Sequence, residues 1–187
     1  SRDMKSTLIK IVGILSTLVA IMAYASDLDD LQLSADQGDL DAQLELARIY
    51  ATGSSSVTRN VRVAMDYYQL AAEQGSHSAQ VALGNLYFNG VSIPQNYLQA
   101  YGWYRLAAHD GWMNGAQFRL GYLYANGLGV TKDLIRAYVW FSVASAQGDT
   151  TASDRKDRYE RLLTTEELNK AQEIATRCFN SVFVDCE

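Results

Sequence analysis

The feature that most constrains this chain is a repeat with a period of about 37 residues. Tyr50, Tyr87 and Tyr124 are each separated by 37 residues. Independent residue types that share one period indicate a stack of similar structural units, each of which contacts its neighbours. An alanine series and a glycine series keep this interval to within one residue: Ala42, Ala79 and Ala116, and Gly38, Gly75, Gly111 and Gly148.

The spacing inside each repeat is helical. In the second repeat, Ala79, Leu83 and Tyr87 follow one another at intervals of four residues, so they share one face of a helix. Gly90 is placed to end that helix, and a second helix is expected to end before Gly111. The chain has a single proline, so little prevents long helices from forming. These patterns predict an antiparallel helix pair in each repeat.

Two kinds of residue recur at unexpected places inside the predicted helices. Gly84 and Gly121 lie in helix interiors, where glycine costs about 1 kcal/mol relative to alanine. We expect a neighbouring helix to approach these glycines too closely for a Cβ atom. Glutamine follows the repeat alanine at Gln43, Gln80 and Gln117, which predicts a hydrogen bond that maintains the repeat.

The repeat resembles a known family. Residues 79–90 read Ala-x-x-x-Leu-Gly-x-x-Tyr-x-x-Gly, and residues 100–111 read Ala-x-x-Trp-Tyr-x-x-Ala-Ala-x-x-Gly. This pattern is similar to the Sel1-like repeat, which is related to the tetratricopeptide repeat. The resemblance covers about residues 35–148 and implies an all-α fold, a right-handed α/α superhelix (a solenoid) of antiparallel helix pairs.

The expected domain organisation follows from this resemblance and from a signal-peptide pattern at residues 1–25, described below. Residues 1–25 are expected to be removed, and 26–187 to form a single repeat domain. The repeats are expected at about 35–74, 75–110 and 111–147, with a capping helix pair at 148–187.

The N-terminal segment has the pattern of a secretory signal peptide. Lys5 and Lys10 are basic, residues 11–23 are mostly apolar, and Ala23 and Ala25 are small residues at the positions that signal peptidase reads. The apolar run is shorter than the roughly 20 residues of a spanning helix, which favours cleavage over an uncleaved anchor. We therefore expect a bacterial periplasmic protein, or one released from the cell, that is not inserted in the membrane after cleavage.

The charge of the chain excludes one class of partner. The formal net charge is −5, and it becomes −7 (13 basic against 20 acidic residues) without residues 1–25. There is no run of Lys or Arg, and binding to nucleic acid requires clustered positive charge. Nucleic acid is therefore not an expected partner.

Cys178 and Cys186 are the only cysteines, and an exported chain predicts a disulfide between them. Eight residues of continuous helix would separate their Cα atoms by about 12 Å, beyond the reach of a disulfide. The chain is therefore expected to bend near Asn180, with Val182 and Val184 folded onto the last helix. A catalytic thiol or a metal pair is the alternative.

The sequence gives little support to catalysis. His77 and His109 are the only histidines, and neither has the spacing of a metal site. Ser153-x-x-Lys156 matches a motif of penicillin-recognising enzymes, but the partner motifs Ser-Asp-Asn and Lys-Thr-Gly are missing. We expect no enzyme activity, no cofactor and no metal. The alternative is a cell-wall protein that binds or hydrolyses peptidoglycan or β-lactams.

The resemblance to tetratricopeptide repeats also implies where a partner would bind. In such solenoids the first helix of each repeat lines a concave groove, and aromatic residues there make good anchors for a partner. The alternative is that these aromatic residues pack between the repeats. We expect one protein partner, with the chain acting as an adaptor for an envelope complex or as an inhibitor or immunity protein for a toxin. The predicted groove residues are Leu44, Arg48, Val81, Asn85, Phe88, Asn89, Phe118, Tyr122 and Asn126.

Overall fold

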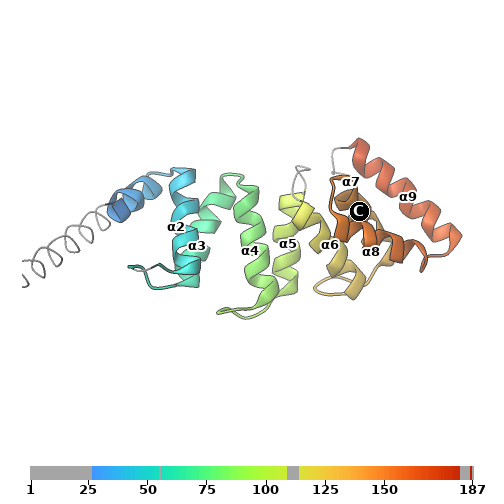
Figure 1. The fold of residues 1–187 in the computed structure, drawn as a ribbon, viewed down its shortest axis with the longest axis horizontal. Coiled ribbons are helices and arrows are strands. Elements are labelled where there is room, and N and C mark those ends of the chain that lie inside the picture. The colour runs from blue at the N-terminus through green and yellow to red at the C-terminus, as the bar shows by residue number, and fades with distance from the viewer. Residues whose placement is uncertain (1–26, 55, 109–113, 182–185, 187) are drawn as a thin grey trace, which may run out of the picture. The chain divides into compact units, whose positions relative to one another are not determined.

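The computed structural model describes residues 27–54, 56–108, 114–181 and 186, and within these residues all regular structure is helical (Figure 1). A helix at 27–36 precedes the other helices. The chain is an all-α solenoid, as the repeat pattern predicts. The helices that follow are α2 (Leu40–Thr52), α3 (Val61–Glu73), α4 (His77–Asn89), α5 (Tyr97–Ala108), α6 (Asn114–Asn126), α7 (Leu134–Ala146), α8 (Thr150–Glu160) and α9 (Thr165–Asn180).

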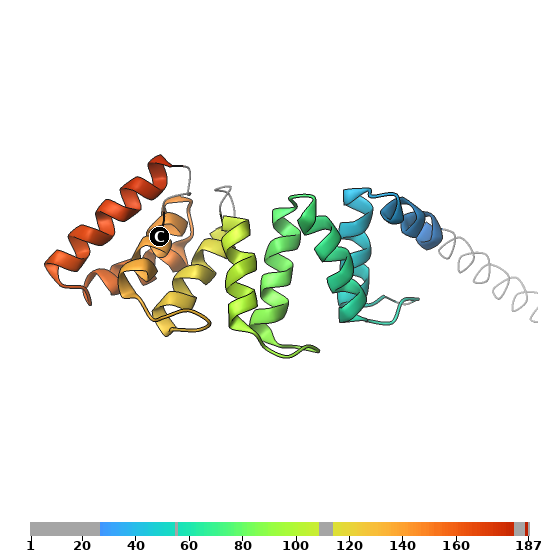
Figure 2. The ribbon, with the colours of Figure 1, turned by 180° about the vertical axis from the view of Figure 1, so that it is seen from behind.

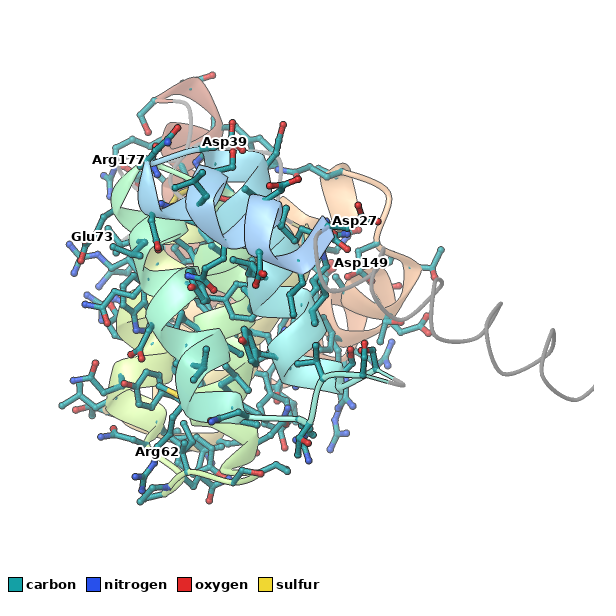
Figure 3. The ribbon with its side chains drawn as sticks, turned by 90° about the vertical axis from the view of Figure 1, so that its left-hand side faces the viewer. Asp27, Asp39, Arg62, Glu73, Asp149 and Arg177 are labelled. Carbon is teal, nitrogen blue, oxygen red and sulfur yellow. A yellow bond between two sulfur atoms is a disulfide. The ribbon has the colours of Figure 1, made fainter. Side chains whose placement is uncertain are left out.

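The chain divides into two compact units, residues 1–67 and 68–187, with the boundary inside α3. In unit 1, the helix at 27–36 packs on α2 through Ala35 and Leu46. The rings of Tyr50 and Tyr67 stack with their centroids 6.2 Å apart. Asp39, labelled in Figure 3, caps α2 by accepting a hydrogen bond from the backbone N–H of Ala42 at 2.7 Å.

In unit 2, successive helices from α4 to α8 contact one another in chain order, and α9 returns to pack on α7 (Figures 1 and 2). Local signals set the ends of these helices. Ser76, Asp133 and Asp149 accept hydrogen bonds from backbone N–H groups in the first turns of α4, α7 and α8. Gly90 ends α4 in the left-handed conformation at φ 67°, as its position predicts.

Close packing explains the two glycines inside helices. A Cβ atom on Gly84 would lie 2.6 Å from the ring of Tyr104 in α5, and one on Gly121 would lie 2.9 Å from the ring of Phe141 in α7. The pairs α4/α5 and α6/α7 therefore each pack an aromatic ring directly against the backbone of their first helix. The predicted reason for these glycines is confirmed.

The recurring glutamines form the predicted bonds in two of three cases. Gln43 donates to the carbonyl of Ala35 at 3.1 Å, and Gln80 donates to the carbonyl of Ala72 at 3.4 Å. Both bonds reach back eight residues, from the first helix of a repeat to the last turn of the preceding helix. Gln117 is also fully buried, but among the described residues neither polar atom of its side chain has a hydrogen-bond partner, so the prediction is wrong for the third repeat.

The C-terminal end is closed by a disulfide. Cys178 and Cys186 are bonded, with their Cα atoms 4.4 Å apart, and both are buried in the main hydrophobic cluster. This confirms the predicted bond, whereas Val182 and Val184 lie outside the described residues. Thr164 and Glu167 form a reciprocal capping box at the start of α9. No helix in the described part of the chain is long and apolar enough to cross a membrane.

Candidate interaction face on α4 and α6

Helices α4 and α6 carry most of the predicted groove residues, and both belong to unit 2. Ring contacts join the two helices at the centre of this surface. We define the α4/α6 face as the surface made by Asn85, Phe88, Asn89, Arg119, Tyr122 and Asn126.

Phe88 lies at the centre of an aromatic cluster. Its ring centroid is 5.8 Å from that of Tyr122 in α6 and 5.4 Å from that of Tyr97, both in edge-on contacts. Tyr104 is a third neighbour, with ring centroids 6.4 Å apart. The guanidinium carbon of Arg119 lies 4.6 Å from the centroid of the Phe88 ring, a cation–π contact. These contacts hold Phe88 in place while its side chain stays half-buried.

Asn85 is oriented by a buried tyrosine. The hydroxyl of Tyr104 donates to Oδ1 of Asn85 at 2.8 Å, and Tyr104 is fully buried. Burial raises the pKa of Tyr104 to about 12, although the nearby positive charge of Arg119 lowers it somewhat. The tyrosine therefore keeps its proton at neutral pH and remains a donor. The amide of Asn85 is left with its two N–H groups free of this contact.

The other two asparagines are more accessible. Asn89, at the end of α4, and Asn126, at the end of α6, are both exposed. Nδ2 of Asn126 donates to the backbone carbonyl of Tyr122 at 2.8 Å. These two side chains are therefore the most open polar groups of the α4/α6 face.

Two predicted groove residues of unit 2 take part mainly in packing. Val81 and Phe118 are half-buried and lie against the main hydrophobic cluster. The Phe118 ring makes an edge-on contact with Phe141 of α7, with centroids 5.4 Å apart. Phe118 thus contacts the second helix of its own repeat, as the packing alternative anticipates. Phe88 and Tyr122 also pack on this cluster, but they do so at the junction of α4 and α6.

The two predicted groove residues of unit 1, Leu44 and Arg48, lie on α2. Arg48 is exposed and forms an ion pair with Glu45 at 2.7 Å, one turn away on α2. Its Nε also donates to the carbonyl of Leu44, which is half-buried. Because exposed ion pairs of this kind contribute little energy, Arg48 remains able to turn toward a partner.

Arg119 is the residue that the sequence prediction missed. It occupies the repeat position of Glu45 in the first repeat and Ala82 in the second, so the repeat pattern gives it no distinction. The available signal was its charge, because Arg119 is the only ionisable side chain other than tyrosine in α6. Only the tertiary structure places it over Phe88.

The two residues of the Ser153-x-x-Lys156 motif have different surroundings in this structure. Both residues lie on α8, where Nζ of Lys156 is 3.4 Å from a carboxylate oxygen of Asp157. Lys156 lines an open cavity of about 500 Å³ between α7, α8 and α9, and Ser153 is not among its lining residues. The described residues also contain no cluster of three or more His, Cys, Asp or Glu side chains that could hold a metal ion.

Comparison with known proteins agrees with this architecture. The family profile described as Sel1 repeat matches residues 40–76, 77–112 and 115–149. A crystal structure of a Sel1 repeat protein from Oxalobacter formigenes is 38% identical, with a TM-score of 0.62, and the match covers 71% of this chain and 98% of that protein.

A second similar structure belongs to a larger protein. It is a protective antigen of uropathogenic Escherichia coli strains that displays an SLR fold, and it is 27% identical with a TM-score of 0.55. The match covers 85% of this chain but 42% of that antigen. No curated protein matches the chain. The three repeat matches and the paired helices show that this chain belongs to the Sel1 repeat family, whose fold commonly mediates protein–protein interaction.

Proposed function

We propose that this protein is an exported interaction module that binds one partner protein through its α4/α6 face. The observation that carries the proposal is the cluster around Phe88. Rings from α4, α5 and α6 meet there, and Asn89 and Asn126 are exposed on the same two helices. Aromatic side chains held in place, with polar groups around them, are typical of the energetic centre of a protein interface.

The choice of compartment rests on two further observations. Disulfides persist in oxidising compartments such as the periplasm, and Cys178 and Cys186 are bonded. The signal-like pattern of residues 4–25 also favours export. N-terminal sequencing of the protein recovered from the envelope checks this point, and a mature chain that begins at Ser26 is expected.

Within this proposal, the chain acts as an envelope adaptor or as an inhibitor that neutralises a toxin. The two roles differ in what binding does to the partner. An inhibitor abolishes the activity of its partner in a stoichiometric complex, whereas an adaptor leaves that activity intact and joins the partner to other proteins. An assay of the identified partner with and without this chain distinguishes them.

Site-specific photo-crosslinking tests the binding face. A photoreactive amino acid replaces Asn89 or Asn126, both exposed, in the chain expressed in its native cell. We expect both positions to crosslink to the same dominant protein, because both lie on the α4/α6 face.

The matched control places the same photoreactive group at Arg105, which is exposed on α5, the second helix of its repeat. We expect no crosslink to that protein from Arg105. Equal crosslinking from all three positions, or crosslinking from Arg105 alone, would contradict binding through the α4/α6 face.

A further inference from the structure

We infer that the α4/α6 face recognises carboxylate groups, and that its partner therefore presents an acidic segment rich in Asp or Glu. This inference rests on the proposed function and specifies the chemistry of the partner. It follows from three observations: the donors left on Asn85, the guanidinium of Arg119 and the distribution of charge along the chain.

Asn85 is fixed so that it offers donors. Its Oδ1 accepts the hydroxyl proton of Tyr104 at 2.8 Å, and in this arrangement Nδ2 takes no part in the contact with the tyrosine. Nδ2 is then left as the end of the amide with hydrogen-bonding capacity, and it can only donate. A partner group that meets Nδ2 must accept hydrogen bonds, as a carboxylate or a backbone carbonyl does.

Arg119 adds a positive charge that acts on Tyr104, the residue bonded to Asn85. Its guanidinium lies over the Phe88 ring at 4.6 Å, and none of the ion pairs found in the described residues involves it. The contact with the ring does not occupy the N–H groups of the guanidinium as hydrogen-bond donors to an acceptor oxygen, so they stay able to bond. Those N–H groups form a planar fork that matches the two oxygens of a carboxylate. The aromatic contact also restricts the side chain, which lowers the entropy lost on binding.

The surrounding sequence carries almost no competing negative charge. Between Glu73 and Asp133 the chain contains a single acidic residue, Asp110, although it has 21 acidic residues in all. Helices α4, α5 and α6 contain none. Asp110 itself lies outside the described residues. At physiological salt, charges separated by more than about 8 Å are largely screened from one another. An acidic segment should therefore meet the least repulsion on the helices of this otherwise acidic protein that carry no acidic residues.

Selection from a peptide library tests the inference. Random 12-residue peptides displayed on phage are selected on the full-length chain, with the disulfide formed, and the enriched peptides are sequenced. We expect enrichment of Asp and Glu. A synthetic copy of the best peptide with its carboxylates changed to amides (Glu→Gln, Asp→Asn) should bind at least about ten-fold more weakly, the equivalent of one charge-assisted hydrogen bond.

Two variants locate the effect on the face. Asn85→Asp keeps an oxygen that accepts from Tyr104 but removes the N–H donors and adds a negative charge. Arg119→Gln removes the positive charge while it keeps a helix-compatible side chain. Each should weaken binding of the acidic peptide about ten-fold or more, with less effect on its amide copy. Arg105→Gln, the matched control, removes an exposed arginine from α5 and should leave binding unchanged. Circular dichroism verifies that all three variants are folded.

The outcomes separate this inference from the proposed function. Selected peptides without acidic enrichment, whose binding is still lost in an Asn89→Ala/Asn126→Ala variant, would overturn carboxylate recognition and leave the α4/α6 face as the binding surface. Acidic peptides that bind the wild type and both variants equally would also overturn it. If no selected peptide depends on any residue of the α4/α6 face, the proposed function fails together with the inference.

Discussion

The absence of a single Cβ atom decides how closely two helices pack in this protein. Gly84 in α4 lies under the ring of Tyr104, and an added Cβ would come within 2.6 Å of that ring. Gly102, on the exposed side of α5, has nothing within 4 Å of the same added atom. The two glycines are both helical, so alanine favours the helix equally at each site. They differ in the space available.

We expect Gly84→Ala to lower the free energy of unfolding by about 1–3 kcal/mol, because the ring of Tyr104 must move. Gly102→Ala should instead raise it by roughly 0.5–1 kcal/mol, through helix propensity alone. Urea unfolding of the two variants and the wild type measures both effects. Stabilisation by Gly84→Ala would show that the close contact is absent in solution.

Tyr104 also gives the protein a defined response to alkaline pH. Because burial raises its pKa to about 12, the folded chain keeps the phenol proton between about pH 10 and pH 12, where an unfolded tyrosine loses it. The unfolded state then binds fewer protons than the folded state, so the free energy of unfolding falls as the pH rises through this window. Below about pH 10 both states are protonated and this contribution to stability is fully present.

Comparison with Tyr104→Phe isolates this effect, because the other tyrosines titrate in both proteins. Between about pH 9 and pH 11.5, the wild type should lose more unfolding free energy than the variant. The variant should be less stable at neutral pH by about 1 kcal/mol, since Asn85 loses its hydrogen bond. Parallel losses in the two proteins would contradict a raised pKa at Tyr104.

At the scale of elements, α9 differs from the repeat helices because it returns to α7. The apolar side of α9, formed by Ala171 and Ala175, packs on α7 at Tyr138 and Val139. The disulfide links Cys178, in the last turn of α9, to Cys186. In the chain-entropy description, a disulfide that closes a loop of this length contributes about 2–3 kcal/mol by restricting the unfolded state.

Urea unfolding with and without a thiol reductant measures this contribution. The reduced wild type and a Cys178→Ala/Cys186→Ala variant should both unfold at lower urea concentration than the oxidised protein. Reductant should have no effect on the variant, which serves as its own control. An unchanged midpoint in the reduced wild type would show that the bond adds no stability.

At the scale of the whole molecule, structure and charge are distributed differently along the chain. The helix pairs recur through both compact units, whereas the acidic residues are concentrated outside residues 74–132. This stretch belongs to unit 2 and contains α4, α5 and α6. A protein that is acidic overall therefore has one stretch that is poor in acidic residues, and the acidic partner that we infer would meet the least repulsion there.

The period of the sequence was enough to determine the class of fold. Tyrosine, alanine and glycine that recur every 37 residues or so require repeated helix pairs, because each pair exposes an apolar face that only the next pair can cover. The helix end at Gly90 depends on local geometry, so it was predictable. The interior glycines indicated a close contact with another helix, but not which ring makes it. The disulfide followed from the number of cysteines.

The side-chain chemistry of the candidate site was decided by the tertiary structure. Repeat positions specify which face of a helix a residue occupies, but not which neighbour it meets. Phe118 turns out to pack on Phe141, while Phe88 joins Tyr122 and Arg119 at the junction of two repeats. Helical spacing reports contacts within a few residues, whereas these contacts join residues more than 20 positions apart. Their geometry depends on how the helices stack, and that information is not present in any one repeat.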